Sequence, residues 1–151
     1  MTTTSTYAGT PSDAVAARRA SLPAGISALA IALIFTIARA DSNAERISMS
    51  ALEIVASALL FGLVVPRALR RESAGGRGLA IGVIAVLLVV PAFWSGLPVL
   101  LGTCAALIGY AGKRAETGSG KSMASLVLGL FAVIGYVAFY VLDYLSTVGV
   151  M

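Results

Sequence analysis

Apolar residues gather into four long blocks along the chain, and the longest block, residues 78–112, contains no charged residue. At about 1.5 Å per residue, one helix of that length would exceed a hydrocarbon core of about 30 Å by more than half. Helix breakers and an interfacial aromatic residue lie near its middle: Pro91, Trp94, Gly96 and Pro98. The block is therefore predicted to fold back as a hairpin of two short membrane helices, residues 79–94 and 98–111.

Each of the other three blocks has the length and apolarity of a single membrane-crossing helix. They comprise residues 22–38, 47–65 and 123–142, and the second is expected to end at Pro66. Together with the hairpin they predict an all-α membrane protein with five transmembrane helices.

The domain organisation follows from these five spans. Residues 1–21 are predicted to form a cytoplasmic tail with a short helix capped by Ser12 or Asp13. The bundle itself takes residues 22–145, and residues 146–151 form an external tail. Flexible connectors rich in glycine and small polar residues are expected at 73–76 and 115–120.

The first apolar block has a second interpretation as a secretory signal. Ala38-Arg39-Ala40 has the small-x-small form of a cleavage site. The apolar run of residues 22–38 is longer than the usual 7 to 15 residues of a signal peptide, so an uncleaved anchor helix is favoured. Cleavage within residues 1–40 stays open at this point.

Basic residues set the expected orientation. With five spans, nine of the eleven Lys and Arg residues fall on one side: Arg18, Arg19, Arg67, Arg70, Arg71, Arg77, Lys113, Arg114 and Lys121. Arg39 and Arg46 fall on the other side. A single tilted span in place of the hairpin would reduce this bias to six against five. Because basic loops stay in the cytoplasm, the count favours five spans with a cytoplasmic N-terminus and an external C-terminus.

Composition supports the membrane class and excludes several kinds of site. The chain is 58% apolar and 12% charged, whereas a soluble domain has roughly 25% charged residues. The net charge of +4 resides at the ends of apolar blocks, so nucleic acid is not an expected partner. With no histidine and one cysteine, Cys104, the sequence excludes His-based zinc sites, haem ligation by histidine and His-based triads, and we expect no cofactor.

A weak internal repeat relates the third and fifth spans. Arg77-Gly78-Leu79-Ala80 and Lys121-Ser122-Met123-Ala124 both precede an aliphatic run, and Leu128-Gly129-Leu130 follows the second. With the basic loop from Lys113-Arg114 through Gly118 and Gly120, these motifs make residues 75–137 resemble the small actinobacterial membrane domains called DUF4190-like. That family implies a helical membrane domain and no particular activity. Ser122, where the family pattern has glycine, departs from it.

Small residues recur at helical spacing and predict close helix packing. The faces are Ala24, Ala28 and Ala32 in the first span, Ala58 and Gly62 in the second, Gly78 and Gly82 in the third, Gly102 and Ala106 in the fourth, and Ser125 and Gly129 in the fifth. We expect most of them to pack within the bundle; a seam that binds another protein is the alternative.

Two polar stripes lie in the external half of the predicted bundle. Arg46, Ser50, Glu53 and Ser57 share one face of the second span, and Tyr136, Tyr140 and Asp143 share one face of the fifth. Ionisable groups inside a span are costly and are functional candidates. We expect the two stripes to pack on each other through hydrogen bonds, and keep ion or proton handling by Glu53 and contact with a partner protein as alternatives. No nucleophile and base accompany the two acids, which argues against catalysis.

A Gly-Lys-Ser sequence at residues 120–122 invites a phosphate-loop interpretation. The full motif needs a glycine at position 115, where the chain has Ala115, so nucleotide binding is not expected. The basic loops are instead expected to meet anionic lipid headgroups: Arg67, Arg70, Arg71, Arg77, Lys113, Arg114 and Lys121.

The sequence thus predicts a small multi-pass protein of a bacterial plasma (inner) membrane, without catalytic activity. An accessory or scaffold subunit of a cell-envelope membrane complex, with other membrane proteins as partners, fits these features best. The alternative is a homo-oligomeric channel or ion-coupled transporter that uses Glu53.

Overall fold

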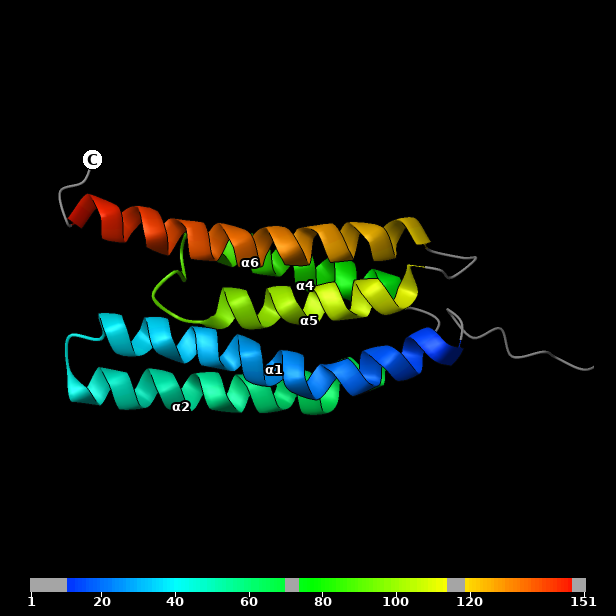
Figure 1. Ribbon diagram of the computed structural model, residues 1–151, viewed down its shortest axis with the longest axis horizontal. Coiled ribbons are helices and arrows are strands. Elements are labelled where there is room, and N and C mark those ends of the chain that lie inside the picture. The colour runs from blue at the N-terminus through cyan, green and yellow to red at the C-terminus, as the bar shows by residue number, and fades with distance from the viewer. Residues whose placement is uncertain (1–10, 70–73, 114–118, 148–151) are drawn as a thin grey trace, which may run out of the picture.

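The computed structural model describes residues 11–69, 74–113 and 119–147, and all regular secondary structure within them is helical (Figure 1). The elements are α1 (Pro11–Arg39), α2 (Asn43–Leu59), a π-helical turn η1 (Leu60–Val64), α3 (Val65–Ala68), α4 (Ala74–Leu88), α5 (Leu97–Gly112) and α6 (Ser119–Thr147). The predicted all-helical fold is confirmed.

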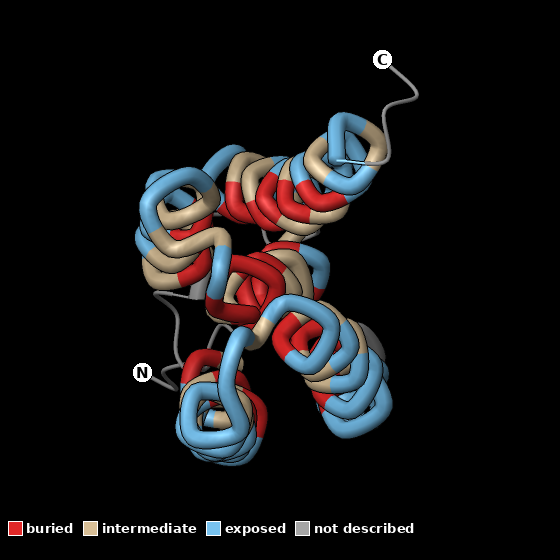
Figure 2. The backbone as a smooth tube through the Cα atoms, turned by 90° about the vertical axis from the view of Figure 1, so that its left-hand side faces the viewer, coloured by how far each residue is buried: buried red, intermediate tan, exposed pale blue. Residues whose placement is uncertain are grey.

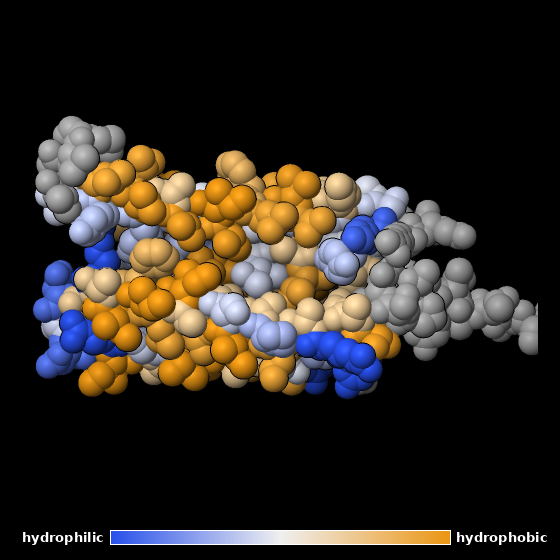
Figure 3. Space-filling view, in the orientation of Figure 1, coloured by the Kyte–Doolittle hydropathy of each residue, from blue (hydrophilic) through white to orange (hydrophobic). Residues whose placement is uncertain are grey.

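Three helical segments within the described residues are long and apolar enough to cross a membrane. They are Val15–Arg39, Asn43–Ala68 and Ser119–Thr147, and two shorter apolar helices, Gly75–Leu88 and Leu97–Gly112, accompany them. Apolar residues cover the flank of the bundle that faces the viewer, and strongly hydrophilic residues gather toward its two ends (Figure 3). This distribution is that of a membrane protein.

The central apolar block folds back on itself, as predicted. α4 and α5 run side by side in opposite directions, joined by a turn at residues 89–96 (Figure 1). α4 ends at Leu88, earlier than the predicted 94, because a helix rarely continues into the residue before a proline and Pro91 lies three residues on. At its other end α4 begins at Ala74, so most of the predicted 73–76 connector belongs to the helix.

The first helix is longer than expected. α1 runs without a break from Pro11 to Arg39, so the expected short helix before residue 22 is part of it. Pro23 lies inside the helix, and the N-terminal part of the helix runs at an angle to the remainder (Figure 1). A proline removes one backbone hydrogen bond and crowds the preceding turn, which accounts for a bend. At the 115–120 connector, Ser119 and Gly120 already belong to α6; residues 114–118 lie outside the described part.

The second helix passes through Pro66 instead of ending there. Proline cannot donate the hydrogen bond that an α-helix requires of it. The chain accommodates it with the π-helical turn η1, in which the N–H of Val65 donates to the carbonyl of Leu60, five residues back. The helix then continues as α3 to Ala68.

α5 is the central helix of the bundle. It packs against α1, α4 and α6, and the buried part of the tube lies in the middle of the end-on view (Figure 2). Ten of its sixteen residues are buried, among them Leu100, Cys104 and Ile108. α2 lies at the periphery and contacts mainly α1.

Glycines let the backbones of α5 and α6 touch. A Cβ atom on Gly129 would meet the backbone of Gly102 and lie 2.6 Å from the backbone nitrogen of Ala106. A Cβ atom on Gly109 would lie 2.9 Å from the Cα atom of Leu126. Ser125 adds a hydrogen bond of 2.8 Å to the carbonyl of Ala105. Close approach of this kind is how helices associate in lipid, where no hydrophobic effect drives them together.

The small-residue faces predicted from the sequence pack inside the bundle in four of the five helices. Ala28, Ala32, Gly78, Gly82, Gly102, Ser125 and Gly129 are buried, and Ala24 and Ala106 are half-buried. The prediction for the second span is wrong, because Ala58 and Gly62 are exposed and nothing lies within 4 Å of a Cβ atom built on Gly62. The neighbouring polar face of α2 turns inward instead, since polar groups cost more in lipid than alanine or glycine does.

We expect Gly129→Ala to destabilise the bundle and Gly135→Ala on the same helix to leave it intact. The new methyl group at position 129 would meet backbone atoms of α5, which cannot turn aside, whereas a Cβ atom at position 135 meets nothing within 4 Å. Overpacking typically costs about 1–3 kcal/mol, and glycine to alanine in an unhindered helix gains about 1 kcal/mol. The measurement is the melting temperature of both purified variants in detergent. Equal melting temperatures would contradict the backbone contact.

Candidate functional site

The predicted polar stripe of α2 forms the inward face of that helix. Glu53 is fully buried, Ser57 is buried, and Arg46 and Ser50 are half-buried. Phe61 and Val65 continue the buried face. Phe61 packs into a notch on α1 where Gly25 leaves room, since a Cβ atom there would lie 2.7 Å from the Phe61 ring. The stripe therefore attaches α2 to the bundle.

Glu53 joins three parts of the fold through one carboxylate oxygen. Its Oε1 atom accepts a short hydrogen bond from the hydroxyl of Thr36 on α1 and a bond of 2.8 Å from the backbone N–H of Gly96, at the start of α5. Thr36 is itself buried. Oε2 of Glu53 is also buried and has no hydrogen-bond partner among the described residues. We call Glu53, Thr36 and Gly96 the Glu53 clamp.

The position of the α4–α5 turn explains why this clamp exists. α5 has 16 residues, about 24 Å of helix, so the turn before it lies inward from the end of α1 and from the start of α2 (Figure 1). A backbone N–H buried in the bundle needs a partner, since no water is present to hydrogen-bond with it. Glu53 provides this partner for Gly96.

Only glycine fits at position 96, because the backbone of the turn lies so close to α1 and α2. A Cβ atom on Gly96 would meet Ala32, with the Ala32 Cα atom at 2.8 Å and Oε1 of Glu53 at 2.9 Å. Ser95 stabilises the same turn, because its hydroxyl and its N–H both donate to the carbonyl of Ala92. The turn thus brings its backbone directly onto α1 and α2.

Two opposing effects act on the charge of Glu53. The N-terminus of α5 favours a nearby negative charge, an effect that reaches about 2 kcal/mol at most. Burial without a cation disfavours the charge by several kcal/mol. Arg46, on the same helix, does not compensate, because its guanidinium donates to Asn43 and to the carbonyl of Ala40. Within the described residues no ion pair involves Glu53.

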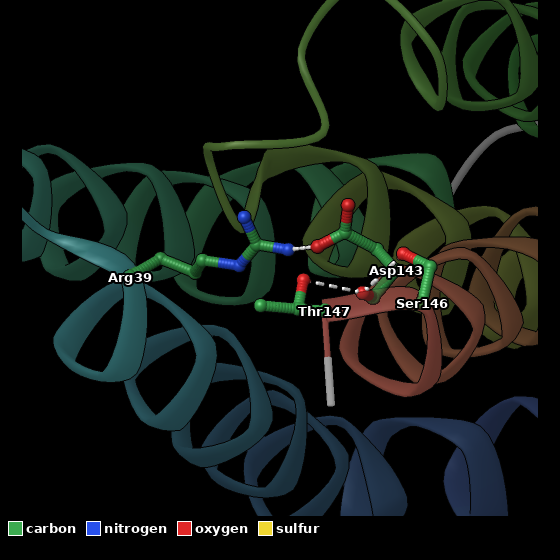
Figure 4. A network of polar contacts seen from close by, with 4 residues as sticks. All are labelled: Arg39, Asp143, Ser146 and Thr147. Carbon is green, nitrogen blue, oxygen red and sulfur yellow. Dashed lines mark hydrogen bonds and ion pairs between the residues drawn. The ribbon is translucent and has the colours of Figure 1, made fainter. Parts of the chain in front are cut away.

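The second predicted stripe, on α6, binds α1 rather than α2. Asp143 forms an ion pair with Arg39 at the end of α1, and its backbone carbonyl accepts hydrogen bonds from Ser146 and Thr147 (Figure 4). Arg39 also lies over the ring of Tyr140, with its guanidinium carbon 5.5 Å from the ring centroid.

Aromatic rings continue this contact between α1 and α6. Phe35 stacks on Tyr140 at 4.3 Å between ring centroids and meets Tyr136 edge-on at 5.7 Å. The prediction that the two stripes form hydrogen bonds with each other is therefore wrong for the described residues. α1 supplies the partners of both stripes, since Thr36 bonds to Glu53 on one side and Phe35 and Arg39 meet α6 on the other.

A small cavity adjoins the clamp at the end of the bundle where α1 ends. Its volume is about 30 Å³, and it is lined by Thr36, Arg39, Ala40, Glu45, Met49 and Trp94. A cavity of this size has room for a water molecule, but it is far below the roughly 300–1,000 Å³ of a small-molecule site. In the described part of the chain no group of three or more His, Cys, Asp or Glu side chains is placed to hold a metal ion.

The predicted lipid-headgroup residues lie away from the clamp, toward the opposite end of the bundle. Arg67, Arg77, Lys113 and Lys121 lie at or near helix ends there, and the ammonium group of Lys113 is 3.7 Å from the ring centroid of Tyr110. Arg70, Arg71 and Arg114 lie outside the described residues.

Sequence reasoning found Glu53 but missed its partners Thr36 and Gly96. One signal was present: Ala24, Ala28 and Ala32 are spaced by four, and Thr36 continues the same spacing on the same helix face. The role of Gly96 had no such signal, since it depends on where the turn lies relative to α1. The pair of Arg39 with Asp143 also joins helices that are distant in sequence.

Comparisons with protein-family models, with curated proteins and with solved structures found no match to this chain. The resemblance to DUF4190-like domains stays a prediction from the motifs.

We expect Glu53→Gln to be tolerated and Glu53→Leu to destabilise the protein. The amide oxygen of glutamine can accept from Thr36 and Gly96 as Oε1 does, whereas leucine leaves both donors buried without a partner. Such bonds contribute about 0.6 kcal/mol each in a membrane, and an unsatisfied buried donor costs about 1–3 kcal/mol. Melting temperatures in detergent should be within a few degrees of the parent for Glu53→Gln and clearly lower for Glu53→Leu. A Glu53→Leu variant as stable as the parent would show that the clamp contributes nothing.

Proposed function

We propose that this is a multi-pass membrane protein with five membrane-crossing helices, a cytoplasmic N-terminus and an external C-terminus, located in the plasma membrane of a bacterium. We propose further that it has no catalytic activity and acts as an accessory or scaffold subunit of a membrane complex.

Successive long helices run in opposite directions along the bundle (Figure 1), which supports five crossings. Basic residues at the end of the bundle where α1 begins support the orientation: Arg18, Arg19, Arg67, Arg77, Lys113 and Lys121. The other end has Arg39 and Arg46 together with Asp41, Glu45 and Asp143. α4 is short for a crossing, with 15 residues, but the turn that follows it extends the apolar segment toward the interface with Trp94 exposed.

The observation that carries the scaffold proposal is the use of the polar groups. Thr36 and the Gly96 N–H both donate to one oxygen of Glu53, and Arg39 pairs with Asp143, so these groups hold helices together. The outer surfaces of α1, α2 and α6 are apolar and exposed. A protein of this kind offers faces for lipid and for other membrane helices, and the cavity beside its polar centre is too small for a substrate.

The alternative function, a homo-oligomeric channel or ion-coupled transporter, has one observation in its favour. Oε2 of Glu53 is buried without a hydrogen-bond partner among the described residues, as expected of a group that binds an ion or a proton. Against a shared pathway, Glu53 faces α1 and the α4–α5 turn inside one chain, and Cys104 on α5 is packed rather than water-accessible.

Reporter fusions test the orientation. A reporter that is active only outside the cytoplasm should be active when fused after Met151, and one that is active only in the cytoplasm should be active when inserted at 115–120. The basis is the nine bases on one side against two on the other. The reverse result at either position would rule out the five-crossing arrangement.

Native mass spectrometry after mild detergent extraction tests the function. A scaffold subunit should be released with stoichiometric, unrelated membrane proteins, because its exposed faces pack against partner helices. A symmetric assembly of this chain alone would instead support the channel. The parent and the Glu53→Gln variant should give the same assembly under the scaffold proposal, since the substitution preserves the clamp.

A further inference from the structure

Two basic side chains at the end of the bundle away from the clamp turn back along their own helices. A guanidinium nitrogen of Arg67, on α3, donates to the carbonyl of Leu63 at 3.5 Å, one turn farther into the apolar segment. The ammonium group of Lys113, after α5, lies 3.7 Å from the ring centroid of Tyr110. Long basic side chains at the ends of membrane helices usually extend toward water instead. Both charges are therefore held at the level of the last helical turn.

The ends of three helices meet at this level. α3 packs against α4 and α5, and α4 packs against α5. Arg67 is exposed near the end of α3, Arg77 is half-buried in the first turn of α4, and Lys113 is half-buried at the end of α5. Tyr110, in the last turn of α5, is 42% exposed although α5 is the central helix. We call Arg67, Arg77, Lys113 and Tyr110 the Arg67 cluster.

No acidic side chain of the described residues balances the charges of the Arg67 cluster. The ion pair within these residues joins Arg39 to Asp143 at the opposite end of the bundle. In sequence, the segments that connect the three helix ends add three bases and two acids: Arg70, Arg71 and Arg114 with Glu72 and Glu116. The connecting segments therefore add to the excess of positive charge, and we expect the counter-ion of the cluster to come from outside the chain.

The start of α4 adds a second feature that favours an anion. The first N–H groups of an α-helix lack partners within the helix, and the helix dipole attracts negative charge there. Gly76 is exposed, and a Cβ atom built on it meets nothing within 4 Å, so this turn is open to a ligand. Arg77 follows directly in the chain. The backbone and the basic side chain thus favour the same kind of ligand.

We propose that the Arg67 cluster binds the headgroup phosphate of an anionic phospholipid. Arg67, Arg77 and Lys113 bind the phosphate oxygens, and the ring of Tyr110 lies at the interfacial level where aromatic residues concentrate. Basic sites between membrane helices recognise anionic headgroups in this way.

A lipid fits the cluster better than free phosphate does. Leu63, to whose carbonyl Arg67 donates, has a side chain that is 44% exposed, and an acyl chain can cover it. Free phosphate would leave this apolar surface uncovered. The proposal goes beyond the scaffold function and does not depend on it, because it rests only on the side chains at these helix ends.

Melting temperatures of the purified full-length protein in a non-ionic detergent test the ligand. Phosphatidylglycerol added to the micelles should raise the melting temperature by several degrees, because a ligand that binds only the folded protein stabilises it. Phosphatidylcholine and inorganic phosphate should leave the melting temperature unchanged. An equal rise with phosphatidylcholine overturns the proposal, since the acyl chains alone would then act. An equal rise with inorganic phosphate overturns the assignment to a lipid.

Substitutions test the site. Each base near a membrane surface contributes about fivefold to the affinity for anionic lipid, so the double variant Arg67→Gln, Arg77→Gln should need roughly 25-fold more phosphatidylglycerol for the same rise. Arg18→Gln is the matched control, because it removes a base at the same end of the bundle. Arg18 lies on the outer face of α1 with Leu22 and Ile26, which are 72% and 61% exposed.

Native mass spectrometry supplies a second measurement. The parent and Arg18→Gln should retain bound phosphatidylglycerol after mild extraction, and the double variant should lose it. Lys113→Gln, which removes the base at the end of α5, should also weaken retention and serves if the double variant does not fold. Equal loss in Arg18→Gln overturns the proposal, because the general positive charge of this end would then attract the lipid. Full retention by the double variant, or by Lys113→Gln in its place, overturns it as well.

Discussion

The contact between the backbones of α5 and α6 is the constraint on which the rest of the bundle depends. Gly102 and Gly109 on α5 and Gly129 on α6 leave no space for a side chain between the two helices. Because α5 has no bulky side chain on this face, α6 packs closely against it, and α1 and α4 pack on its other sides. Because α1 takes the remaining side of α5, α2 is left at the periphery with only one face to bury.

A short central helix creates a second requirement. The turn that precedes α5 lies inward from the ends of the longer helices (Figure 1), and its last two residues, Ser95 and Gly96, are buried, so their backbone N–H groups are removed from water. In lipid such groups must find partners within the protein. Gly96 allows the turn to reach α1, and Glu53 accepts the hydrogen bond that water would otherwise accept. The short length of α5 thus explains the acidic residue inside α2, which α2 by itself does not.

The sequence predicts the helices and the hairpin well, because apolar length and helix breakers act locally. It predicts the inward face of α2 only in part. Two faces of that helix were candidates for the inward orientation, the stripe with Glu53 and Ser57 and the pair Ala58 and Gly62. Lipid favours burial of the polar face. The partner of Glu53 could not be predicted, because the choice of α1 over α6 depends on which helix α5 contacts. The ion pair of Arg39 with Asp143 depends in the same way on the arrangement of helices distant in sequence.

An acidic residue inside a membrane protein is usually interpreted either as structural or as chemically active, and the geometry at Glu53 supports a structural role. The structural role uses one oxygen, because two donors converge on Oε1. The other oxygen, Oε2, is buried without a hydrogen-bond partner among the described residues and takes no part in that role. The start of α5 needs an acceptor for the N–H of Gly96, and an acidic side chain on α2 meets this need because a helix N-terminus favours a nearby carboxyl group.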